Sequence, residues 1–178
     1  MRRPVIRRNT PLPSWTAREP LASGPSRSSL SVRNRHGGVS VNCRQLERWT
    51  RTLLRDLLRK EIFDLAVCLV DSQEITRLNE RFLQHRGSTD VITFDYCDAA
   101  TSRWLSGEIF ICVDEAVKQA WRFRTSWQSE VVRYVVHGVL HLCGYGDRTA
   151  GARRRMKRRE DRLVKQLTER FPVRRLGG

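Results

Sequence analysis

The sequence has no long apolar run and no paired cysteines. No stretch approaches the roughly 20 apolar residues that a membrane-spanning helix needs, and the first 38 residues lack the apolar centre of a secretory signal. The five cysteines are odd in number, scattered and without a CxxC pair, which is typical of a reducing compartment where they pack as small hydrophobic residues. They are Cys43, Cys68, Cys97, Cys112 and Cys143. We therefore expect a soluble, cytoplasmic protein without membrane contact.

Acidic residues are also scarce. There are 19 aspartates and glutamates against 34 lysines and arginines, which gives a formal net charge of +15 and a pI of about 11.0. An excess of this size attracts polyanions, of which nucleic acid is the commonest and an anionic membrane surface the second. The composition favours RNA or DNA as a partner.

The first 38 residues hold eight arginines and five prolines against one acid, Glu19. Such a segment buries too little apolar surface to offset the entropy lost on ordering, so we predict a disordered basic arm over residues 1–38. Three interpretations of this arm remain open: a segment that contacts RNA, an organelle transit peptide, or an extension from a mis-assigned start codon.

Regular secondary structure is expected from Val39 onward. Apolar periodicity predicts helices over residues 43–60, 72–81, 114–124, 126–142 and 151–170, and short β-branched or aromatic runs predict strands over residues 38–42, 64–70, 90–96 and 107–113. Together these elements predict one α+β domain over residues 39–170, with about five helices on a single small mixed sheet of about four strands. Residues 171–178 are expected to form a flexible tail.

The stretch "HGVLHLCGYGD", residues 137–147, carries the pattern of a metal site. His137 and His141 are four apart on a predicted central helix and project from one face. Gly144 can take the positive φ that ends a helix, so Asp147 can present a carboxylate to the same point. Two imidazoles and one carboxylate suit zinc, with a fourth position open for a nucleophilic water. The alternative is that both histidines are core residues, which would each need a polar partner.

The same spacing occurs in the zinc protease signature HExxHxxGxxH. Its general-base glutamate is replaced here by Gly138. Without that carboxylate, peptide hydrolysis lacks the group that activates water, so a zincin-type metallopeptidase is the second candidate.

Several ordered blocks resemble the YbeY family of metal-dependent endoribonucleases. "HGVLHLCGYGD" is similar to the family signature HGxLHLxGYDH, and "LNERF", "STDVITF" and "GEIFICVDEAVKQA" resemble further family blocks in the same order, as do Met156 and Glu160 of a final MxxxE. The match spans residues 39–165. The resemblance implies a small α+β fold with one zinc per chain and cleavage of single-stranded RNA. It also implies maturation of the 3′ end of small-subunit ribosomal RNA and ribosome quality control, with the rRNA precursor, the small subunit and its assembly factors as partners.

The sequence departs from the family pattern at the site. Asp147 stands where the family has its third histidine ligand, and Leu83 aligns with a family arginine expected to meet phosphate. Arg86, three residues on, is either the substitute or an exposed loop arginine. Arg148 is a second candidate for phosphate contact. The residues identify no general base and no oligomeric state, so a non-catalytic RNA- or ribosome-binding module with a structural zinc stays as a third candidate.

Other polar residues near these motifs have two interpretations each. Thr89 and Asp90 line the site or cap and turn the backbone, with the structural role favoured. Tyr145 stacks on a base or packs, and Cys143 is expected in the core. A basic run follows the metal loop and favours contact with a phosphate backbone. It consists of Arg148, Arg153, Arg154, Arg155, Lys157, Arg158 and Arg159.

Overall fold

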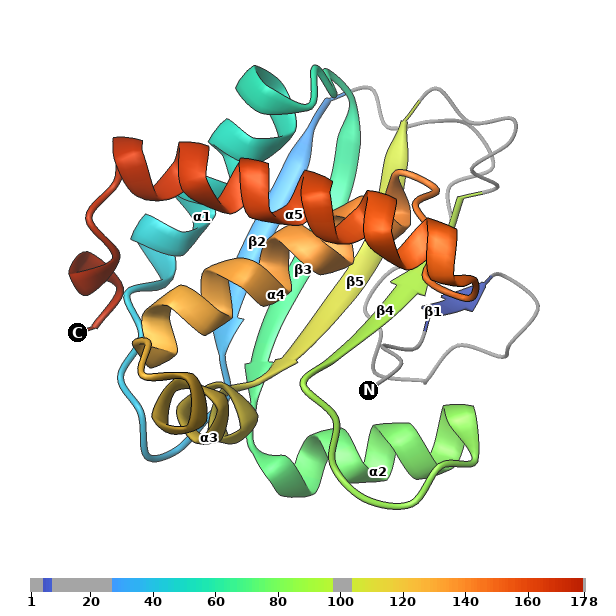
Figure 1. Ribbon diagram of the computed structural model, residues 1–178, viewed down its shortest axis with the longest axis vertical. Helices are drawn as coiled ribbons and strands as arrows, with labels where there is room; N and C mark the ends of the chain where they lie inside the picture. Colours follow the sequence, from blue (N-terminus) through green and yellow to red (C-terminus); the bar gives the residue numbers. More distant parts are fainter. Residues whose placement is uncertain (1–4, 8–26, 98–103, 178) are drawn as a thin grey trace.

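One mixed β-sheet organises the chain (Figure 1). The computed structural model describes residues 5–7, 27–97 and 104–177. The sheet has five strands in the order β1-β4-β5-β3-β2, which are β1 (Val5–Arg7), β2 (Ser29–Asn34), β3 (Phe63–Val70), β4 (Val91–Asp95) and β5 (Leu105–Cys112). Strands β2, β3 and β5 run parallel to one another. Strand β4 pairs antiparallel with β5, and β1 pairs parallel with β4. The expected mixed sheet and α+β class are confirmed, with the three-residue β1 added at one edge.

Side-chain caps mark where most of the helices begin. The helices are α1 (Cys43–Thr52), which continues into the π-helical turn η1 (Leu53–Leu57), α2 (Ser72–Leu83), α3 (Val113–Phe123), α4 (Trp127–Leu142), α5 (Ala150–Arg170) and the 3₁₀ turn η2 (Val173–Leu176). Asn42, Asp71, Ser126 and Thr149 each accept a hydrogen bond from a backbone N–H in the first turn of α1, α2, α4 and α5.

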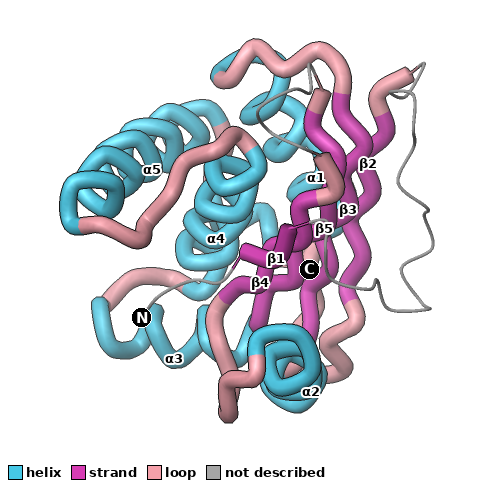
Figure 2. Tube along the Cα trace, turned by 90° about the vertical axis from the view of Figure 1, so that its right-hand side faces the viewer, coloured by secondary structure: helices cyan, strands magenta, loops and turns pink. Residues whose placement is uncertain are grey.

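The helices cover both faces of the sheet (Figure 2). α4 and α1 share one apolar core with the sheet, and α2 packs against the opposite face in a second core. α5 lies over α4 rather than on the sheet, and α3 contacts α4 beside it. α4 is therefore the central helix, enclosed between the sheet and α5.

Two glycines lie at the contact between α4 and β5, where a larger residue would not fit. A Cβ added at Gly138 of α4 would meet Ile109 Cγ2 at 2.8 Å. One added at Gly107 of β5 would meet first the Phe94 carbonyl oxygen of β4 and then Leu142 Cδ2 of α4 at 2.8 Å. Both distances are below normal van der Waals contact, so neither position has room for a methyl group. The sheet thereby fixes the height and register of the helix that carries His137 and His141.

The predicted domain boundaries are wrong at both ends. Residues 29–34, assigned to the disordered arm, form β2, whose Leu30 is buried and whose backbone pairs with β3. Residues 38–42 form no strand beyond the isolated bridge between Val41 and Gly177. The expected flexible tail contains η2, where Leu176 is fully buried and its carbonyl accepts a hydrogen bond from the Asn42 N–H at 2.9 Å. Residues 8–26 lie outside the described residues, so the three interpretations of the arm stay predictions.

The cysteines agree with their expected packing as small hydrophobic residues. All five cysteines are free thiols, and burial raises the pKa of Cys68, Cys112 and Cys143 to about 11. These three thiols stay protonated at neutral pH and behave as small hydrophobic groups. None of the helices in the described part of the chain is long and apolar enough to cross a membrane.

Candidate metal centre

His137, His141 and Asp147 meet at the C-terminal end of α4. One possible ligand atom from each residue lies within 4.8 Å of the other two. Both histidines are buried, at 6% and 5% exposure, and their ring centroids are 4.6 Å apart. The i, i+4 spacing on one helix face accounts for the pairing of the rings. This cluster could bind a metal ion.

The second nitrogen of each imidazole is already engaged. His137 Nδ1 lies 2.8 Å from Glu160 Oε2 of α5, and His141 Nδ1 lies 2.9 Å from the carbonyl oxygen of Tyr145. A carbonyl only accepts, so the Nδ1 of His141 must donate, and a carboxylate requires the same of His137. With the proton on Nδ1, each ring presents the lone pair of its buried Nε2. A histidine that binds a metal through Nε2 needs this tautomer.

A tight loop brings Asp147 back to the histidines. α4 ends at Cys143, and Gly144 takes φ +86°, a conformation that favours glycine. The Tyr145 N–H then donates to the Leu140 carbonyl at 3.0 Å. Further along, Arg153 Nη1 of α5 donates to the carbonyl oxygens of Asp147 and Arg148 at 3.0 and 3.2 Å. The backbone that carries the carboxylate is thus held both by the loop itself and by Arg153.

The donor set fits a small divalent ion. Two ligand atoms of a tetrahedral zinc lie about 3.4 Å apart. The three candidate ligand atoms here lie within 4.8 Å of one another, so small side-chain movements are enough for them to bind one zinc ion. Two nitrogens and one oxygen are ligands that zinc accepts, and three protein ligands leave a fourth position open.

A charged network surrounds Glu160. Arg133 Nη1 contacts Glu160 Oε1 and Asp161 Oδ1, both at 2.7 Å, and Lys157 Nζ contacts the same Asp161 oxygen at 2.7 Å. Burial lowers the pKa of Arg133, but its hydrogen bonds to Asp161 and Glu160 outweigh burial and raise it overall. Arg133 is therefore a permanent cation. Its charge offsets the cost of burying the Glu160 carboxylate, which is only 3% exposed.

A cavity of about 810 Å³ opens beside the cluster. His137 and Asp147 line it together with residues of α3, the turn after α3, the N-terminal half of α4 and the start of α5. Its cationic lining residues are Arg122, Arg133, Arg153 and Lys157. Its volume falls within the range of roughly 300–1,000 Å³ that is usual for small-molecule pockets. Its acidic lining residues are Asp90, Glu130, Asp147 and Glu160. A metal at the cluster would therefore face a substrate-sized space lined by charges of both signs.

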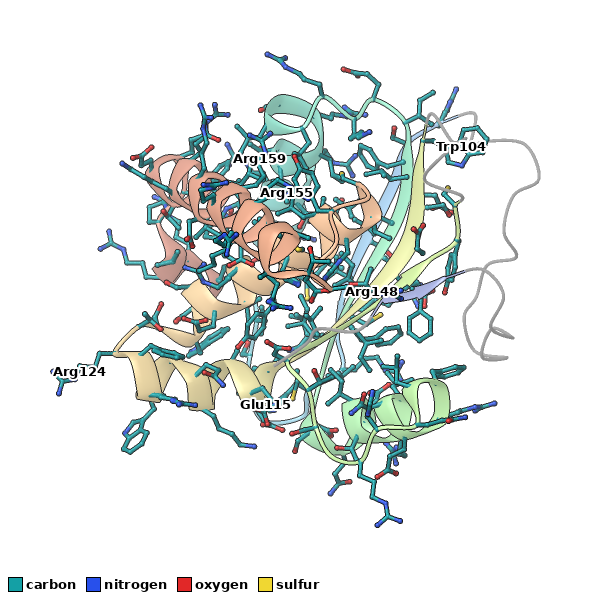
Figure 3. The ribbon with its side chains drawn as sticks, turned by 45° about the vertical axis from the view of Figure 1, so that its right-hand side comes forward. Trp104, Glu115, Arg124, Arg148, Arg155 and Arg159 are labelled. Atoms are coloured by element: carbon teal, nitrogen blue, oxygen red, sulfur yellow. The ribbon has the colours of Figure 1, made fainter. Side chains whose placement is uncertain are left out.

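The two arginines expected to contact phosphate at the site lie outside the cavity. Arg86 is exposed and is not among the residues that line the cavity. Leu83, where the family arginine aligns, packs beside the core under α2. Arg148 is exposed next to Asp147, at the start of α5 (Figure 3). The structure therefore brings neither Arg86 nor Arg148 into the lining of the cavity.

The remaining candidate residues either line a cavity or stabilise the backbone and core. Asp90 lines the cavity, and its Oδ1 accepts hydrogen bonds from the Val91 N–H and from Thr89 Oγ1, so it also turns the backbone into β4. Tyr145 lines a separate cavity of about 210 Å³. Cys143 packs against the main core, as expected. Of these residues, only Asp90 borders the space next to the metal cluster.

The sequence did not reveal the position of three residues that line the cavity beside the metal cluster. Arg133 lies one helical turn before His137, a spacing that could have revealed it. Glu160 was noted as part of a motif, but its contact with His137 spans 23 residues and has no local signal. Phe123 borders the cavity from the end of α3, where nothing in the pattern distinguishes it from a core aromatic.

The basic run lies mostly on the outer face of α5. Arg153, Arg154, Arg155, Lys157 and Arg158 are exposed, whereas Met156 and Glu160 point inward. Arg155 and Arg159 come from successive turns of this helix (Figure 3). Contact between this face and a phosphate backbone stays a prediction.

Comparison with known proteins gives a consistent result. A sequence profile of the family described as Endoribonuclease YbeY matches residues 31–168. A protein named Endoribonuclease YbeY from Bacteroides fragilis is 33% identical over 124 residues, 70% of this chain and 86% of that protein. One of the same name from Salinibacter ruber is 35% identical over 141 residues, 76% and 89% of the two chains. The solution structure of TM1509 from Thermotoga maritima has the same fold, with a TM-score of 0.60, 22% identity, and coverage of 82% of this chain and 95% of that one.

Proposed function

The chain belongs to the YbeY family of endoribonucleases, and we propose that it hydrolyses phosphodiester bonds of single-stranded RNA with a zinc ion held by His137, His141 and Asp147. The observation that carries this proposal is the position of the three-residue cluster at the wall of a substrate-sized cavity. A bound zinc ion supplies Lewis acidity and lowers the pKa of a water at its open position to about 7.

The chain's own residues would divide the remaining work. Glu160 accepts from His137 and orients its ring, and Tyr145 does the same for His141 through its carbonyl oxygen. Arg153 holds the backbone of Asp147 while its charge faces the cavity. A phosphodiester entering the cavity would meet Arg122 and Arg153, whose charges offset those on its non-bridging oxygens.

The geometry at Gly138 argues against the peptidase alternative. A zincin needs a glutamate at this position, and Gly138 lies against Ile109 with no space for even a methyl group. A glutamate there would have to displace α4 from the sheet. No other observation among the described residues favours peptide hydrolysis.

The biological substrate is a finer part of the same proposal. We infer that the RNA is the precursor of small-subunit ribosomal RNA, cleaved near its 3′ end in the cytoplasm, and that the small subunit and its assembly factors are partners. The family membership and the net charge of +15 support this assignment.

Metal analysis combined with RNA cleavage tests the proposed function. The purified full-length protein is analysed for metals by mass spectrometry and incubated with a single-stranded RNA, its duplex and an unstructured peptide, with and without a chelator. We expect about one zinc per chain and cleavage of the single strand alone, abolished by the chelator and restored by zinc. Cleavage that survives complete metal removal, or cleavage of the peptide but not of RNA, contradicts the proposal.

A further inference from the structure

The end of α3 presents two aromatic side chains to the surface. Trp121 is 87% exposed and Phe123 is 60% exposed, and the next residue, Arg124, projects away from the molecule (Figure 3). Full burial of a phenylalanine would stabilise the fold, and the largely exposed Phe123 contributes little of this. Its exposure therefore has no explanation in the stability of the domain.

Phe123 borders the cavity of the metal centre, and Trp121 does not. The cavity follows α4 from Glu130 to His137, a rise of about 10 Å along the helix. Thr125, just after α3, donates a hydrogen bond to Glu130 at 2.7 Å, which ties the end of α3 to the first turns of α4. The end of α3, which carries Phe123, thus lies by the N-terminal part of α4, and His137 lies two turns further along this helix.

The charges near Phe123 suit a nucleic-acid strand. Arg122 holds its guanidinium carbon 5.5 Å from the centroid of the Phe123 ring, a cation–π arrangement. Arg133 and Lys157 are neutralised by Glu160 and Asp161. In the part of the chain that the structure describes, by contrast, neither Arg122 nor Arg153 forms an ion pair. Arg122 by the aromatic ring can therefore meet a phosphate, and so can Arg153 with the donors that its bonds to the metal loop leave over. The acidic lining residues Asp90 and Glu130 limit RNA to a path along these two arginines.

We propose that Phe123, supported by Arg122, is a base-stacking platform for a single-stranded RNA whose backbone runs along the cavity to the metal centre. Bases inside a duplex already stack on both faces, so only an unpaired base can lie on this ring. The platform rests on the proposed function, because it places RNA in the same cavity. It adds a residue that selects unpaired nucleotides.

Matched ligands and variants separate stacking from general charge attraction. Binding of the full-length, metal-loaded protein is measured by fluorescence anisotropy at low temperature, with a 2′-O-methyl single-stranded RNA and with an abasic oligonucleotide of the same length and charge. A gel checks that both ligands stay intact. We expect Phe123→Ala to weaken RNA binding about 5- to 100-fold, the range for loss of one stacked base. Abasic binding should change by less than about twofold, because electrostatic attraction to the backbone does not need the ring.

Two controls define the effect further. Phe123→Tyr keeps an aromatic ring and should bind RNA within about twofold of the unchanged protein, because the stacking surface is retained. Trp121→Ala removes a more exposed aromatic residue from the same helix, outside the cavity, and should have no effect. Because Phe123 is largely exposed, circular dichroism should show unchanged folding for all three variants.

The results distinguish this inference from the proposed function. Equal RNA affinity of Phe123→Ala and the unchanged protein, or an equal loss with the abasic ligand, overturns the stacking platform. A loss in Trp121→Ala as large as in Phe123→Ala also overturns it. If the unchanged protein binds RNA through Phe123 but cleaves no unmodified RNA, the proposed function fails and the platform stands as a binding surface.

Discussion

Glu160 Oε2 lies 2.8 Å from Nδ1 of His137, and the two residues come from different helices. The contact makes α5 part of the metal centre, although none of the three candidate ligands is on that helix. It also explains why a nearly buried carboxylate is present at the interface of α4 and α5.

We predict that Glu160→Gln weakens zinc binding by about 10- to 100-fold, the usual effect of removing a carboxylate that orients a histidine ligand. The neutral amide no longer favours the Nδ1–H form of His137 to the same degree. Equilibrium dialysis against a metal buffer gives the affinity. Asp161→Asn is the matched control, because Asp161 contacts Arg133 and Lys157 but not the histidine. Equal affinity of the two variants would rule out the orienting role.

Removal of the carboxylate ligand should affect metal and catalysis together. We expect Asp147→Ala to lower zinc affinity by more than about 100-fold, since a ligand is lost rather than a supporting contact, and to abolish RNA cleavage at limiting zinc. Asp147→His, which provides the histidine of the family pattern, should retain metal. Full zinc occupancy of Asp147→Ala by elemental analysis would contradict the ligand assignment.

Gly138→Ala should destabilise the domain by about 1–3 kcal/mol, the usual range for an extra methylene in a tight interface. The added methyl would press on Ile109 and push α4 away from β5. Thermal unfolding measures the loss, and Ile109→Val in the same chain should recover part of it. Gly146→Ala is the control, because nothing lies within 4 Å of the added Cβ. A stability of Gly138→Ala equal to the control would show that α4 can move freely.

The acid stability of the fold should depend on Asp114. This carboxylate lies 2.9 Å from His36 Nε2, and its other oxygen accepts from the Ser72 N–H at 2.7 Å. Burial raises the pKa of Asp114, but the hydrogen bonds to His36 and Ser72 outweigh burial and lower the pKa below its usual 3.8. A lowered pKa stabilises the fold above the unfolded-state pKa, and this contribution disappears as the pH falls through the folded-state value.

Asp114→Asn should therefore cost about 1 kcal/mol at pH 7, the order of one hydrogen bond at a partly exposed site. The difference from the unchanged protein should shrink as the pH approaches 3, which melting temperatures across this range will measure. Asp56→Asn serves as the control, since Asp56 is largely exposed. A difference that stays constant down to pH 3 would contradict the role of the ionised carboxylate.

Local spacing was sufficient to place the candidate ligands. His137, His141 and Asp147 lie within eleven residues of sequence, and one helix and one turn bring them together. The contacts of Glu160 and Arg153 with this site depend on how α5 packs on α4, which periodicity does not reveal. Gly138 was interpreted as a missing general base, but its role in packing became visible only with Ile109 in place.

The errors at the domain ends have a common cause. β2 alternates Leu30 and Val32 with polar residues, but the surrounding arginines and serines gave the segment the composition of a disordered arm. Its strand conformation depends on pairing with β3, a partner about 35 residues away. Leu176 stands in a single 3₁₀ turn, which is too short to show a period. Contacts with distant parts of the chain thus determine the structure of both segments.

The close contact of α4 with β5 has a consequence for the kinetics of metal exchange. The two histidines sit on a helix that Gly138 and Gly107 hold against the sheet, whereas Asp147 follows three exposed loop residues, Gly144, Tyr145 and Gly146. The imidazoles therefore depend on the packed core for their positions, whereas the carboxylate depends on the hydrogen bonds that hold this loop, including those from Arg153. We expect the ion to leave by releasing Asp147 first, so the residence time of the metal should follow the motion of this loop.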